Sequence, residues 1–193
     1  MLLCTAAAQR GSAFCRVLGS AEQQSWLDSG LELAWSAAAG EEVADECAEL
    51  LDALDALDVL DAGDDEGEAY EGHGGYDDDP TARPGFYADQ AVGLVGEALA
   101  MSIRPSAERV ETVLKTLRTL LSMVDFKLGG EKPVIVRGGE PRPAPGPLVQ
   151  REEDAEREVL AAPAVAEAQE SAQAFVAEVT PSVEEFAEAS HWD

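Results

Sequence analysis

The sequence has few basic residues. It contains 13 Lys and Arg against 39 Asp and Glu, which gives a formal net charge of −26 at pH 7. An excess of this size surrounds the molecule with a negative potential that repels nucleic acid and anionic membranes and attracts basic proteins. A solvated acidic surface without any partner has the same composition. The charge therefore predicts no nucleic-acid or membrane partner, and it leaves a cationic protein partner and a merely solvated surface as the two interpretations.

Residues suited to catalysis are also scarce. The two histidines, His73 and His191, lie in no pattern with a nucleophile, and the sequence has no phosphate-binding glycine motif, no CxxC and no HExxH. Its three cysteines, Cys4, Cys15 and Cys47, lie within apolar helical patterns, which is typical of buried, reduced thiols. Reduced thiols fit a cytoplasmic protein. We therefore expect no cofactor and no catalytic residue.

Long apolar runs are missing as well. No segment approaches the roughly 20 unbroken apolar residues of a membrane span, and the first residues lack the basic region and long apolar stretch of a secretory signal. Apolar residues instead make up 46% of the 193 residues and recur at helical spacing. Aromatic residues contribute only 6%, so Ala and Leu must provide most of the packing.

The apolar spacing predicts a compact all-α bundle of about five helices over residues 1–130. Ser20 followed by Gln23 is a capping-box pattern that opens the second helix. In the fourth helix, Gly93 and Gly96 are positions that allow a close contact with another helix. The expected boundaries of these helices are Gly19, Gly40, Asp61, Pro84, Pro105 and Gly130.

The densest acidic segments are the third helix and the residues after it. Leu and Asp repeat every three residues from 51 to 61, so the aspartates form a stripe that winds around the helix. Residues 61–84 are rich in Gly, Asp and Glu without an apolar period, and we expect them to form a disordered acidic loop. The loop does not match an EF-hand, although its three consecutive aspartates could hold a divalent cation loosely. The candidate partner-binding acids are Asp52, Asp55, Asp58, Asp61, Asp77, Asp78 and Asp79.

The composition changes after Gly130, where we expect the hydrophobic core to end. Residues 131–149 are rich in Pro and Gly, and we expect them to form a linker. Residues 150–193 are acidic and rich in Ala and Glu, and we expect a partly helical tail that is broken at Pro163 and Pro181. Within this tail, residues 175–186 have the pattern of an acidic amphipathic helix that docks either on a partner or on the domain itself, and a loose solvated tail has the same composition. The candidate binding residues of this helix are Phe175, Val179 and Phe186.

Three segments carry a resemblance to a known family: Leu-Glu-Leu-Ala-Trp at 31–35, Tyr-Ala-Asp-Gln-Ala-Val at 87–92, and the apolar pattern of residues 110–121. Through them, residues 2–126 resemble a bacterial all-helical family of unknown function. The resemblance implies an all-helical fold and no active site, because none is established for that family.

The acids are unevenly distributed along the chain. Residues 80–149 contain seven acids and nine bases, so a mildly basic segment lies between three acidic blocks. The helix expected over 105–130 carries most of the basic face, with Arg109, Lys115, Arg118 and Lys127. We expect the acidic loop or the tail to fold back on this basic helix.

Charge and the missing catalytic motifs together predict a non-catalytic protein that binds a cationic protein partner. An immunity protein that neutralises a basic toxin, or a polyanion mimic, would have this composition. Two alternatives stay open. One is an enzyme whose carboxylates bind a divalent metal in a helical bundle, and the other is a structural protein that associates through the leucine stripe of residues 51–60.

Overall fold

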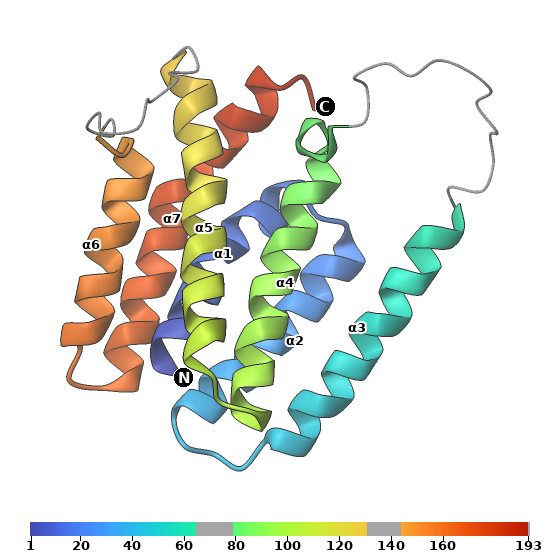
Figure 1. The fold of residues 1–193 in the computed structure, drawn as a ribbon, viewed down its shortest axis with the longest axis vertical. Helices are drawn as coiled ribbons and strands as arrows, with labels where there is room; N and C mark the ends of the chain where they lie inside the picture. Colours follow the sequence, from blue (N-terminus) through green and yellow to red (C-terminus); the bar gives the residue numbers. More distant parts are fainter. Residues whose placement is uncertain (65–78, 131–143, 193) are drawn as a thin grey trace.

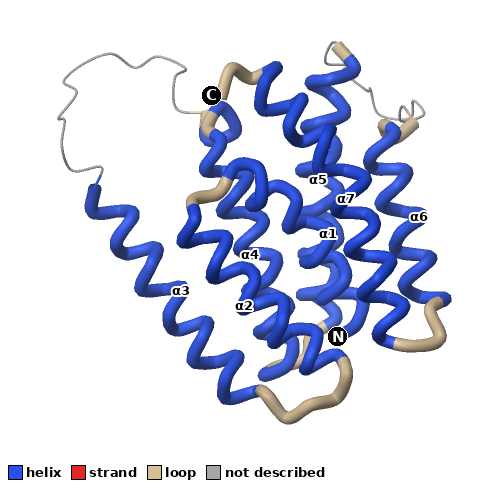
Figure 2. Tube along the Cα trace, turned by 180° about the vertical axis from the view of Figure 1, so that it is seen from behind, coloured by secondary structure: helices blue, strands red, loops and turns tan. Residues whose placement is uncertain are grey.

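The computed structural model describes residues 1–64, 79–130 and 144–192, without the side chains of residues 55–64. This part of the chain contains seven α-helices, one short 3-10 helix and no strand, which confirms the all-α prediction. The prediction of about five helices concerned residues 1–130, where five of the α-helices lie, and the bundle gains two more from the segment after it. In Figures 1 and 2 the helices form one bundle, with α3 along one edge and α6 along the opposite edge. The elements are α1 (Leu2–Leu18), α2 (Ala21–Ala38), α3 (Ala44–Asp64), η1 (Pro80–Ala82), α4 (Pro84–Ile103), α5 (Ala107–Gly129), α6 (Pro147–Ala161) and α7 (Val165–Ala189).

Helix α1 lies at the centre of the bundle. It contacts α2, α4, α5, α6 and α7, and every residue from Cys4 to Cys15 is buried. Most of these residues are small, so neighbouring helices can approach the backbone of α1 closely from several sides. Apart from Gln9 and Arg10, the residues from Cys4 to Cys15 are apolar or small on every side of the helix, which is typical of a helix enclosed by its neighbours.

Helices α2, α4 and α3 pack as one side of the bundle. The predicted capping box opens α2: the hydroxyl of Ser20 accepts from the Gln23 backbone N–H at 3.1 Å, and the Gln23 side chain accepts from the Ser20 N–H at 2.9 Å. Gly30 brings α2 close to α4, because a Cβ at this position would lie 2.6 Å from a methyl group of Val95. Helix α3 packs on α2 and α4 with one face only, through Cys47 and half-buried leucines including Leu50 and Leu51.

The hydrophobic core does not end at Gly130, as we had expected. Residues of α6 and α7, among them Val149 and Phe175, belong to the same buried cluster as residues of α1, α2, α4 and α5. Helix α7 covers the side of α1 that α2 and α4 leave open, and this burial compensates for the low apolar content of the segment. The predicted break at Pro181 is also wrong, since α7 continues through it with the flanking Val179 and Val183 buried in the core.

The loop and linker predictions fall mostly outside the described residues. Helix α3 extends to Asp64, residues 65–78 are not described, and Pro80–Ala82 form η1 at the end of the predicted loop. Of the predicted linker, residues 131–143 are not described, and residues 147–149 already belong to α6.

Candidate functional site

The predicted partner-binding aspartates do not form one described cluster. Asp52 is exposed on α3, whereas the side chains of Asp55, Asp58 and Asp61 and the whole of Asp77 and Asp78 lie outside the described residues. Asp79 caps η1 by accepting from the Thr81 backbone N–H at 3.0 Å and from its hydroxyl at 2.7 Å. These hydrogen bonds lower the pKa of Asp79. Asp79 thus has a local structural role in addition to its charge.

Phe175, Val179 and Phe186 are core residues. Their exposed fractions are 0%, 1% and 3%, and Phe186 makes edge contacts with the rings of Tyr87 and Trp192, whose centroids lie 5.1 and 5.2 Å away. Of the outcomes left open for this segment, which were docking on a partner, docking on the domain itself and a loose solvated tail, docking on the domain is the one found. While α7 is in place, these side chains are therefore unavailable to a partner.

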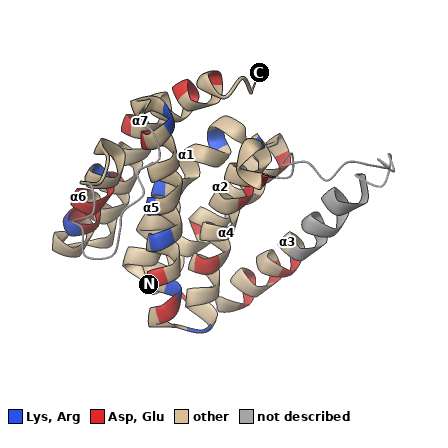
Figure 3. Cartoon of the chain, turned by 45° about the horizontal axis from the view of Figure 1, so that its top comes forward, with Lys and Arg blue, Asp and Glu red and all other residues tan. Residues whose placement is uncertain are grey.

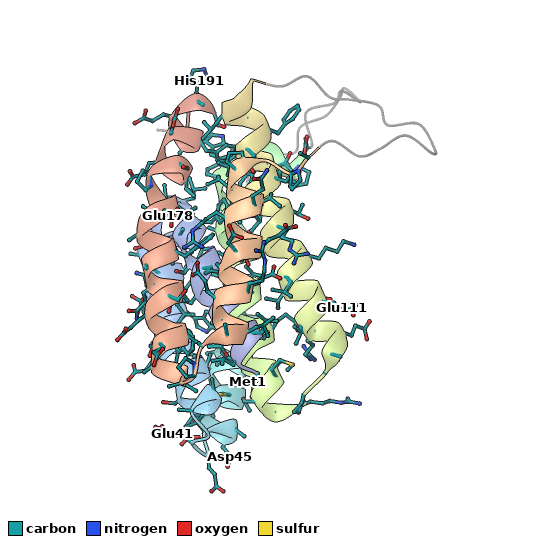
Figure 4. The ribbon with its side chains drawn as sticks, turned by 90° about the vertical axis from the view of Figure 1, so that its left-hand side faces the viewer. Met1, Glu41, Asp45, Glu111, Glu178 and His191 are labelled. Carbon is teal, nitrogen blue, oxygen red and sulfur yellow. The ribbon has the colours of Figure 1, made fainter. Side chains whose placement is uncertain are left out.

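The acids at the turn between α2 and α3 and on the first turns of α3 remain at the surface. We call them the acidic face: Glu41, Glu42, Asp45, Glu46, Glu49 and Asp52. All six are exposed, and none forms an ion pair within the described part of the chain. Part of the reason lies in the sequence: no Lys or Arg occurs between Arg16 and Arg83, a stretch that holds twenty acids, so these six acids have no basic residue near them in the chain. Figure 3 shows the acids along the described part of α3, and Figure 4 shows Glu41 and Asp45 extending from this end of the bundle.

A depression of about 640 Å³ lies within the acidic face. Glu41, Glu42, Asp45 and Glu46 contribute to its wall, and the apolar side chains of Val43, Met101 and Pro105 also line it. Such a combination suits a Lys or Arg side chain, whose aliphatic stem packs on apolar surface while its charged group meets carboxylates. Asp45 and Glu46 also stabilise α3 itself, because they lie in its first turn near the positive end of the helix dipole.

Arg10 and Glu152 form an ion pair in the interior. The guanidinium of Arg10 donates to both carboxylate oxygens at 2.6 and 2.7 Å, and both side chains are fully buried. Burial raises the pKa of Glu152, while the hydrogen bonds from Arg10 oppose this shift by favouring the carboxylate. Sequence reasoning missed the pair because α1 and α6 are separated by most of the chain.

A second arginine links α6 to the rest of the bundle. One turn beyond Glu152, Glu156 accepts two hydrogen bonds from Arg118 of α5, at 2.9 and 2.5 Å. The expected return of the tail to the basic helix is therefore seen in this contact between α6 and α5. Arg109, on the same helix, pairs with Glu97 of α4 instead.

The cysteines are free and buried, as predicted. Burial raises the pKa values of Cys4 and Cys15 to about 11, so both thiols stay protonated at neutral pH. Among the described residues, no group of three or more His, Cys, Asp or Glu side chains is placed to hold a metal ion. None of the helices in that part of the chain is long and apolar enough to cross a membrane.

A second surface feature is a groove of about 720 Å³ along α5, with walls from η1, α4 and the end of α7. We call it the basic groove, because the charged residues among its described lining are Lys115, Arg118 and Lys127, without any acid. Its other lining residues are Thr81, Tyr87, Thr119, Ser122, Met123, Phe126, Phe186 and Ser190. Sequence reasoning identified the basic side chains but not the apolar ones that share the groove with them.

The fold places the chain in the class of all-α bundle proteins, with a central helix enclosed by its neighbours. Comparison with known proteins finds no matching family model, no similar curated protein and no similar solved structure. The resemblance of residues 2–126 to a bacterial helical family therefore stays a prediction.

Proposed function

We propose that this is a non-catalytic binding protein that engages a cationic protein partner through the acidic face. The observation that carries the proposal is the contrast between paired and unpaired acids. Several carboxylates of α6 are held by arginines, as Glu152 is by Arg10 and Glu156 by Arg118, whereas the six acids of the acidic face form no ion pair with any described residue.

The shape of the acidic face supports a protein partner over a diffuse ion atmosphere. The depression combines four carboxylates with apolar lining, which favours an amphipathic cationic side chain. Helix α3 packs with one face only and lies at the edge of the bundle, so a partner can reach its other face. Clustered charge of one sign also increases the rate of association with a basic partner, and salt weakens this effect.

A charge-neutralised variant tests the proposal. The full chain is titrated with a fluorescent lysine-rich peptide, and Kd is measured by anisotropy at low and high salt. We expect Glu41→Gln, Glu42→Gln, Asp45→Asn and Glu46→Gln together to raise Kd about tenfold at low salt, since four exposed ion pairs of about 0.3–0.5 kcal/mol each sum to that factor.

The matched control removes the same number of charges from exposed positions on α7: Glu167→Gln, Glu170→Gln, Glu184→Gln and Glu188→Gln. We expect this variant to raise Kd by less than about threefold, because only the long-range field changes. Equal weakening in both variants would show that net charge alone attracts the peptide, and the proposed face would then be wrong.

A further inference from the structure

We infer that the basic groove is a second docking site, which receives an acidic amphipathic helix from a partner protein. This inference goes beyond the proposed function, because it concerns a surface of opposite charge on other elements of the fold. It rests on the charge of the groove, its exposed apolar residues and its shape.

The charge of the groove comes mainly from Lys115 and Lys127. Both are exposed, and neither forms an ion pair with any residue that the structure describes, whereas Glu156 already engages Arg118. The nearby Asp125 does not neutralise them through a contact, since it accepts hydrogen bonds from the backbone N–H groups of Leu148 and Val149 at the start of α6. Among the described residues, therefore, no acid lines the groove and none forms an ion pair with either lysine.

The positive charge of the groove contrasts with the net charge of −26 of the whole molecule. An acidic partner is repelled by most of the surface and attracted only where positive potential exceeds the surrounding negative one. The repulsion elsewhere therefore adds specificity, because it disfavours alternative docking positions for the same partner.

Apolar side chains lie between the two lysines. Phe126 is 45% exposed, one of only three large hydrophobic residues this exposed in the described part of the chain. Met123 is half-buried beside it, and the buried rings of Tyr87 and Phe186 form the deeper wall. Covering Phe126 and Met123 would remove apolar surface from water, a gain that an ion or a purely acidic peptide cannot supply.

The shape of the groove favours a helix over a small molecule. Lys115, Thr119, Ser122 and Phe126 follow one another at intervals of four, three and four residues, so they form an exposed stripe along α5. Small-molecule pockets enclose most of their ligand, whereas an occupant of this exposed stripe keeps one side in water. A partner helix has such a solvent-facing side, and an amphipathic helix presents its apolar residues to a groove at helical spacing.

Lys115 and Lys127 are the first and last residues of α5 in the groove, and they are separated by about 18 Å of helix rise. The matching occupant carries Asp or Glu near both ends of a segment of about three turns and Leu or Phe in between. Charge at the ends sets its position, and the apolar residues provide contact area.

The test uses a synthetic, fluorescein-labelled helical peptide of about 18 residues (about 27 Å), with Glu near both ends and Leu and Phe on one central face. It is titrated against the full chain and against Lys115→Gln/Lys127→Gln, Phe126→Ala and the control Arg104→Gln/Arg157→Gln. The control removes two exposed cations outside the groove. All four proteins are compared by circular dichroism to establish that the fold is unchanged.

We expect Kd to rise about tenfold for Lys115→Gln/Lys127→Gln at low salt, about fivefold for Phe126→Ala at both low and high salt, and less than twofold for the control. Replacing the Glu residues of the peptide by Gln should weaken its binding to the wild-type chain to the same extent as the double lysine variant does. Equal effects of the two double variants, or no binding of the peptide at millimolar concentration, would overturn the inference.

Two further measurements distinguish the acidic face from the basic groove, and a helical peptide from a small amphiphile as the occupant of the groove. The variant neutralised at Glu41, Glu42, Asp45 and Glu46 should bind the acidic peptide at least as tightly as the wild type, so failure of one site is distinguishable from failure of the other. Laurate, a small amphiphilic anion, should displace little of the bound peptide. Full displacement by micromolar laurate would overturn the inference and assign the groove to a small amphiphile.

Discussion

The Arg10–Glu152 pair sets two full charges where neither reaches water. Removing a carboxylate and a guanidinium from water is costly, and their mutual attraction compensates only when the remaining polar atoms also find partners. Here the compensation is incomplete, because the Nη1 atom of Arg10 has no hydrogen-bond partner among the described residues. The pair therefore specifies how α6 sits on α1 more than it stabilises the bundle.

A double-mutant cycle checks this interpretation. We expect Arg10→Met and Glu152→Leu each to lower the free energy of unfolding by about 3–5 kcal/mol, because each leaves a buried charge without its partner. The combined variant should lose far less than the sum of the two, and it should approach the wild type. Urea denaturation measures all four proteins, and additive losses would show that the pair does not act as a unit.

The free energy of unfolding of the same variants should depend on pH, and the direction of this dependence follows from the burial of Glu152. Glu152 has a raised pKa in the folded protein, so the folded state binds its proton more tightly than the unfolded chain does. The contribution of Glu152 to stability is therefore most favourable below its unfolded pKa and falls as pH rises through its folded pKa. Arg10→Met removes the hydrogen bonds that oppose the shift, so the fall in unfolding free energy between pH 4 and 7 should be steeper in this variant than in the wild type.

Among the helices, packing decides whether a glycine lies at a close contact with another helix or at an open position. Sequence reasoning treated Gly93 and Gly96 of α4 alike as points of close helix contact. Only Gly96 meets another helix, through the methyl groups of Leu51 and Leu54 of α3, while Gly93 faces open space. The close approach of α2 to α4 occurs instead at Gly30.

Two alanine substitutions separate these situations. Gly93→Ala should raise the free energy of unfolding by about 0.5–1 kcal/mol, because alanine favours the helix and its methyl group meets nothing within 4 Å. Gly30→Ala should lower it by about 1–2 kcal/mol, since its methyl group would lie 2.6 Å from Val95 and the overlap outweighs the helix propensity. Thermal or urea unfolding measures both, and a stabilising Gly30→Ala would show that α2 and α4 can separate without loss.

For the whole molecule, the distribution of charge is as important as its amount. The acidic face lies where α2 turns into α3, and the basic groove runs along α5 on another part of the surface. Figure 3 shows acidic positions along the described part of α3 and basic positions on α5. Like charges on the acidic face repel one another in the compact state, and an excess of one sign destabilises a folded chain through self-repulsion.

Salt should therefore stabilise this protein. Raising NaCl from about 10 mM to about 150 mM shortens the Debye length from about 30 Å to about 8 Å and screens the repulsion. We expect a gain of about 1 kcal/mol, which corresponds to a rise in Tm of about 2–4 °C for a chain of this size, measured by calorimetry. The variant neutralised at Glu41, Glu42, Asp45 and Glu46 should show a smaller rise, and a Tm that falls with salt would mean that ion pairs dominate over repulsion.

Local patterns in the sequence predicted the parts of the fold that depend on neighbouring residues. The all-helical class, the capping box at Ser20 and Gln23, and the free, buried state of the three cysteines all follow from spacing or composition within a few turns. The prediction that the core ends at Gly130 was wrong because it depended on residues that are distant in the sequence. Whether Phe175 and Val179 are buried depends on the open side of α1, which lies more than 150 residues away in the chain.

The candidate site divides in the same way. The sequence by itself determined the net charge and the long stretch without a base, because both depend on composition alone, and it therefore excluded an ion pair between near neighbours in the sequence of the acidic face. Only the tertiary structure decided which charges are neutralised and which stay available. By bringing α6 onto α1 and α5, the fold pairs Arg10 with Glu152 and Arg118 with Glu156. It leaves Lys115 and Lys127 exposed in the same groove as Phe126, since ion pairing depends on distances in space that the order of residues does not state.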